Sequence, residues 1–106
     1  MKVRWRILEG ENDATPRPEP DWEAVSPEML QAAIAELLPA WRWAWVEHDV
    51  RGRGLDEIAA ELEVPARSIA ARVLRARRML CQLLVARLGQ ADLRKQLRNR
   101  VRKGVR

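Results

Sequence analysis

The hydrophobic pattern of residues 55–84 constrains the fold of this chain more than any other feature. Apolar side chains first recur with the i, i+3, i+4, i+7 spacing of one helical face, at Leu55, Ile58, Ala59 and Leu62. Val64-Pro65 interrupts this pattern, because proline disfavours a helical conformation in the residue before it. A second helical stripe then follows at Ile69, Val73, Ala76, Leu80, Leu83 and Leu84. The sequence therefore predicts a short helix, a turn of about three to four residues and a longer helix.

The opposite face of the second predicted helix is basic. It carries Arg67, Ser68, Ala71, Arg72, Arg75 and Arg78. Two such helices joined by a tight turn are typical of a helix-turn-helix, which lays its second helix in the major groove of DNA. We expect Arg67 and Arg72 to read guanine. Three further arginines, Arg75, Arg77 and Arg78, are expected to meet phosphates.

Four segments of the chain resemble a known family. They are Leu38-Pro39, GLDEIAAEL at residues 54–62, VPARSIAAR at residues 64–72, and Arg75-Ala-Arg77. Together they resemble region 4 of bacterial sigma factors, most closely that of the extracytoplasmic-function group, over roughly residues 38–84. The resemblance implies a helical domain that reads the upstream promoter element of double-stranded DNA and docks on the flap of the RNA polymerase β subunit.

Three residues depart from the family pattern. Ala70 and Ala71 stand where many members have Lys and Ser, so two polar contacts are absent. Glu63 replaces the usual turn glycine, the residue type that most easily adopts a positive φ, and it brings a negative charge close to the DNA side. We therefore expect fewer contacts to bases than in the family, and a larger contribution to binding from DNA shape, phosphates or a protein partner.

Residues 40–50 place three tryptophans at alternate positions. On a helix, Trp41 and Trp45 share one face and Trp43 lies on another, so other helices must flank this one on both sides if all three are to be covered. One interpretation is that all three build a core that has no Phe or Tyr. The other, favoured by the family resemblance, is that some of them line an apolar groove that binds a partner helix.

The two ends of the chain differ in character. Residues 2–8 alternate apolar and basic side chains, which predicts a short β-strand, and residues 9–21 read as a flexible acidic linker. Gly89 is expected to end or bend the long helix. Residues 91–103 then read as a basic amphipathic helix or tail, for which a solvated tail, phosphate contact and a membrane surface are the alternatives.

Composition excludes several classes of protein. The chain has 106 residues, a net charge of +5, one cysteine and no apolar run of membrane-spanning length, and we expect no signal peptide. Its basic side chains are concentrated in residues 41–106, which indicates a polyanionic partner such as nucleic acid. Cys81 cannot form an internal disulfide, which favours a reducing cytoplasm. No spacing suits a metal, a cofactor or a catalytic group, so we expect no enzyme.

These observations predict an all-α fold: a small helical bundle with a helix-turn-helix, plus a short N-terminal β-strand. The predicted organisation is a strand and linker over 1–21, the helix-turn-helix domain over 22–88 and a basic helix or tail over 89–106. The predicted function is that of a small DNA-binding transcription regulator that acts with RNA polymerase, and we expect the chain to be a stand-alone domain or a fragment. Two alternatives are a module that binds the polymerase flap or a sigma surface through Trp41, Trp43 and Trp45, and a helix-turn-helix subunit of a phage assembly.

Overall fold

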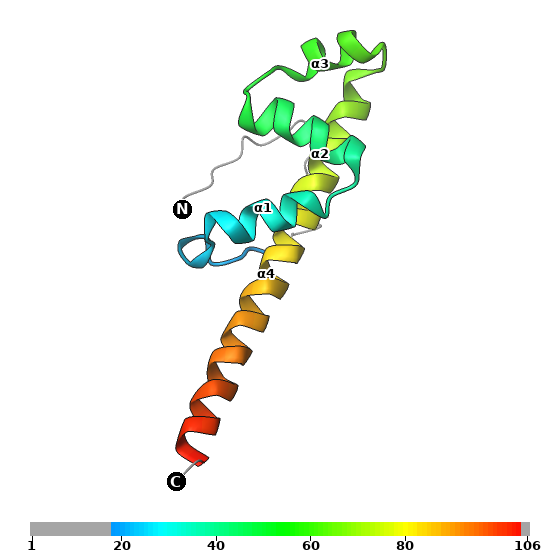
Figure 1. The fold of residues 1–106 in the computed structure, drawn as a ribbon. Coiled ribbons are helices and arrows are strands. Elements are labelled where there is room, and N and C mark those ends of the chain that lie inside the picture. Colours follow the sequence, from blue (N-terminus) through cyan, green and yellow to red (C-terminus); the bar gives the residue numbers. More distant parts are fainter. Residues whose placement is uncertain (1–17, 105–106) are drawn as a thin grey trace.

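A computed structural model describes residues 18–104, with side chains described as far as residue 100. The regular structure of these residues is entirely helical (Figure 1). In chain order the elements are the 3-10 helix η1 (Trp22–Ala24), α1 (Pro27–Ala35), α2 (Pro39–Trp45), the π-helix η2 (Val46–Val50), α3 (Leu55–Leu62) and α4 (Ala66–Gly104). The all-α prediction is thus confirmed for the described part of the chain. The strand predicted at residues 2–8 lies outside it.

Local sequence signals set the helix starts. The Ser26 hydroxyl accepts a hydrogen bond of 3.1 Å from the Met29 N–H, and Pro27 occupies the first position of α1, where a missing N–H costs nothing. Pro39 likewise opens α2, after Leu38 in an extended conformation. Gly54 is the N-cap of α3, as its sequence position suggests. These breaks fold the first half of the chain into short helices that pack around α4.

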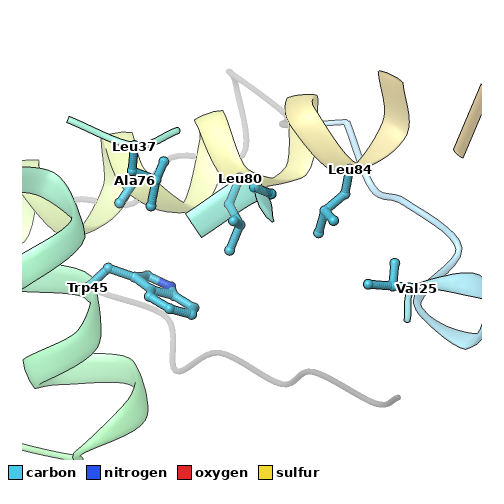
Figure 2. Close-up of a cluster of buried hydrophobic side chains, with 7 residues drawn as sticks. Val25, Leu37, Trp45, Ala76, Leu80 and Leu84 are labelled. Carbon is cyan, nitrogen blue, oxygen red and sulfur yellow. The ribbon is translucent and has the colours of Figure 1, made fainter. Parts of the chain in front are cut away.

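The core consists of two clusters arranged along α4. The first joins η1, α1 and α2 to the middle of α4, and Figure 2 shows its side chains converging. Its buried members are Val25, Ala33, Leu37, Trp45, Ala76, Leu80 and Leu84. The second lies beneath the turn between α3 and α4, with the buried members Ala44, Ile58, Ala59, Ile69 and Val73. Helix α2 contributes to both clusters and α4 runs through both, so the orientation of the helix-turn-helix is coupled to the whole bundle.

The three tryptophans of α2 divide between these clusters. Trp45 is only 5% exposed and belongs to the first cluster, against which Trp41 also packs. Trp43 packs against the second cluster. Helix α4 packs against α2, and α1 and α3 each share one of the two clusters with it. All three tryptophans therefore contribute to the core, while Trp41 and Trp43 keep part of their surface exposed.

Helix α4 is 39 residues long and runs through Gly89. The sequence predicts that the helix ends or bends at Gly89, and it does not end there. A glycine ends a helix when the chain needs a left-handed residue there, and neither Gly89 nor its neighbours depart from helical geometry. The residues beyond Leu88 are exposed as far as the side chains are described, so the last part of α4 projects from the bundle (Figure 1).

No helix in residues 18–104 combines the length and apolarity that crossing a membrane requires.

Candidate nucleic-acid interface

The helix-turn-helix consists of α3, a three-residue turn and the first part of α4. The turn begins at Glu63, which has φ 55° and ψ 45° and is the one non-glycine residue with a positive φ in the described chain. This left-handed residue lets the Val64 N–H donate to the Ala59 carbonyl at 3.0 Å and so closes the end of α3. The sequence comparison with the family correctly located a position that favours glycine, and here a glutamate adopts the conformation.

The predicted DNA-contacting residues lie together on one surface of α4. Arg67, Arg75 and Arg78 are exposed, and Ser68, Ala71 and Arg72 are partly exposed. The other side of the same turns bears Ile69, Val73 and Ala76, each fully buried. Residues 67–78 span about 18 Å along the helix, comparable with the ~12 Å width of a major groove. We call this set of six residues the basic surface of α4.

Arg77 is not part of the basic surface, and the expectation that it meets phosphates is wrong. Its side chain is 0% exposed. Its Nη2 and Nε donate to the two carboxylate oxygens of Asp49, at 2.6 and 2.8 Å. The partner Asp49 was missed because it lies in η2, far away in the sequence. The spacing of Arg77 from Val73 and Leu84 offered a signal, since it places the arginine beside the apolar stripe.

Arg53 organises the loop that precedes α3. Its guanidinium contacts Glu47 at 2.9 Å, Glu61 at 2.6 Å and Glu57 at 3.3 Å. These hydrogen bonds, that to Glu47 first and that to Glu61 next, raise the pKa of Arg53 above its ordinary value, so it stays charged. Because Glu47 belongs to η2 while the other two carboxylates belong to α3, Arg53 fixes the first helix of the helix-turn-helix to the preceding segment.

His48 holds the same loop from the other side. Its Nδ1 donates a hydrogen bond of 2.8 Å to the carbonyl of Arg53. The half-buried ring thus satisfies a loop carbonyl. Within residues 18–104 no group of three or more His, Cys, Asp or Glu side chains is placed to hold a metal ion. Cys81 is buried in α4.

Fold and site define a DNA-binding helix-turn-helix protein: a short helix, a tight turn and a second helix whose outer surface is basic. The model of the family Sigma-70, region 4 matches residues 28–80, half of the chain, and the chain belongs to this family. The match begins within α1, so α1 is part of the family domain and not only a neighbour of it. No solved structure matches the chain.

Proposed function

We propose that this protein is a transcription regulator that binds promoter DNA through the basic surface of α4 and acts together with RNA polymerase. The observation that carries the proposal is that the arginines of α4 are divided between the core and the surface. Arg77 is buried in an ion pair with Asp49, whereas Arg67, Arg75 and Arg78 lie at the surface. A helix kept basic on its solvent side, in a family of DNA-binding domains, suits a polyanion.

Within this proposal, position along α4 assigns the roles. Arg67 and Arg72 lie near the N-terminus of the helix, which meets base edges first, and each suits a bidentate contact to guanine. Ala71 lies between them and suits contact with a thymine methyl group. Ser68 suits a phosphate oxygen, and the later residues Arg75 and Arg78 suit phosphates that position the helix.

The test compares two arginines of α4 that differ in position. Arg72→Ala should weaken binding to a selected promoter fragment by about 1–3 kcal/mol and relax base preference at one position. Arg87→Ala is the matched control, because Arg87 contacts Glu36 at 3.0 Å outside the basic surface, and its loss should change DNA affinity little. Fluorescence anisotropy over a salt series should give a log–log slope of roughly −4 to −5 for about five phosphates. Equal losses in the two variants would reject the assignment.

A contact with the polymerase flap is a second candidate function, and an exposed apolar set beside α2 favours it. Leu38 is 55% exposed at the start of α2, and Trp41 and Trp43 are only partly buried. Trp45 is taken up by the core, so a partner would meet Leu38, Trp41 or Trp43. Pull-down with the flap, after nuclease treatment, should succeed for the wild-type chain and fail for Leu38→Asp with Trp41→Ala. Retained capture would remove this candidate.

A further inference from the structure

The last part of α4 has no partner within the described chain. We call residues 89–104 the arm. The last core residue of α4 is Leu84, and every residue from Gly89 to Arg100 is exposed. An isolated helix of this length is marginal in water, and a glycine in a helix interior costs about 1 kcal/mol relative to alanine. Its helical state therefore gains from a surface that covers it.

Two adjacent rows of side chains define one side of the arm. Leu93 and Leu97, spaced i, i+4, are 55% and 50% exposed. Arg94 and Arg98 form the neighbouring row with the same spacing. The sequence of the arm contains six basic residues and one acidic residue. A complementary surface must therefore be acidic, and it must let a helix approach closely enough to cover the two leucines.

The opposite end of the same chain offers such a surface. Residues 18–36 contain five acidic residues and no basic residue, and we call these five residues the acidic face. All five acids are exposed: Glu19, Asp21, Glu23, Glu28 and Glu36. On α1, Ala32 lies between Glu28 and Glu36 at i+4 spacing, and its small side chain permits close approach of another helix.

One contact already joins these two kinds of surface. Arg87, just before the arm, contacts Glu36 at 3.0 Å. The arm itself cannot fold back to extend this contact, because it continues α4 without a break and leaves the bundle beyond α1 (Figure 1). Pairing of two arms with each other would bring like charges together. The acidic face within reach of the arm is thus that of another molecule.

We propose that the arm of one molecule binds the acidic face of a second copy, and that the exchange is reciprocal, giving a two-fold dimer. Each molecule supplies one arm and one acidic face, so the same contact forms twice. Leu93 and Leu97 pack over Ala32 of α1, while Arg94 and Arg98 meet carboxylates of the acidic face. The dimer presents two helix-turn-helix units related by a two-fold axis, the symmetry that suits a pseudo-palindromic site.

The experiment uses two charge-reversal variants of the full chain, measured by sedimentation equilibrium without nucleic acid. The arm variant is Arg94→Glu with Arg98→Glu, and the face variant is Glu23→Lys with Glu28→Lys. Each alone should weaken dimerisation by about tenfold or more, because both contacts of its dimer are mismatched. An equimolar mixture should restore a heterodimer, because the acidic arm then meets a basic face and the unchanged pair also matches. Arg75→Glu, a charge reversal outside the arm, is the control and should leave the dimer intact.

Several results would overturn the proposal. A wild-type chain that stays monomeric at every concentration reached, or dimerises only when nucleic acid is added, excludes the second copy as the occupant of the arm. A mixture that fails to restore the dimer excludes the reciprocal pairing. Leu93→Ser with Leu97→Ser should also weaken the dimer, and circular dichroism of each variant distinguishes a lost contact from a lost fold. Since no DNA is present, the result is independent of the proposed function.

Discussion

The buried ion pair between Asp49 and Arg77 predicts a large and asymmetric effect of mutation. Asp49→Ala removes a carboxylate that accepts two hydrogen bonds, of 2.6 and 2.8 Å, from a guanidinium that is 0% exposed. The arginine then remains within the protein with its charge no longer compensated by this partner. Truncating one member of a buried pair costs about 3–5 kcal/mol, a large part of the ~5–15 kcal/mol that stabilises a domain of this size.

Thermal and urea unfolding followed by circular dichroism measure this cost. At about 4–8 °C per kcal/mol, the Tm of Asp49→Ala should fall by roughly 12 to 40 °C. Glu36→Ala is the matched control, because it removes an ion pair whose side chains are 34% and 50% exposed and which contributes at most about 1 kcal/mol. Replacing both partners, as Asp49→Leu with Arg77→Met, should recover most of the loss, since an apolar pair of similar volume avoids the desolvation of two charges.

The reasoning fails if Asp49→Ala and Glu36→Ala lower the free energy of unfolding equally. It also fails if the double replacement is less stable than Asp49→Ala, because the penalty would then come from lost shape and not from the loss of the Asp49 charge beside the buried Arg77.

Three smaller predictions concern backbone positions. Glu63→Gly should stabilise the fold by roughly 1 kcal/mol in urea unfolding, because residue 63 has a φ of 55°, which glycine adopts more easily. Glu63→Gln should leave stability nearly unchanged. Both variants should strengthen DNA binding, because each removes a negative charge. Gly89→Ala should raise helicity measured by circular dichroism, by about 1 kcal/mol of local helix stability, because a Cβ there meets nothing within 4 Å. Ser26→Ala should cost about 1 kcal/mol in thermal unfolding through loss of the cap on Met29, and recovery by Ser26→Asp would attribute the loss to capping.

The helices that local signals define could be predicted from the sequence. Helices begin at three places that local sequence signals indicate. These are Ser26-Pro27, Pro39 and the break between the two apolar stripes at Pro65. The left-handed residue at 63 could be located only through the resemblance to the family, which usually has glycine at this position. Such features depend on a few neighbouring residues, which a single sequence contains.

Features that depend on contacts between distant residues could not be predicted. Arg77 looked like its neighbours in a basic run, and only packing against η2 shows that it faces Asp49. Gly89 carries a local tendency to end a helix, but α4 continues through it. The π-helix at residues 46–50 directs Glu47 and Asp49 inward, and the apolar periodicity of the sequence does not predict it. The six residues of the basic surface lie on one side of α4, and their contact with DNA stays a prediction.

Because α4 is continuous, the arm and the basic surface belong to one rod and move together. With 39 residues the helix is about 58 Å long, and its two ends carry different surfaces, the basic surface near Pro65 and the arm at the other end. The bundle packs on residues 69–84, which carry most of the basic surface, so only the arm projects from it. A rotation of the molecule by about 10° displaces one end of α4 relative to the other by about 10 Å, close to the width of a major groove. In the proposed complex, a force applied to the arm would therefore change the angle at which the basic surface meets DNA.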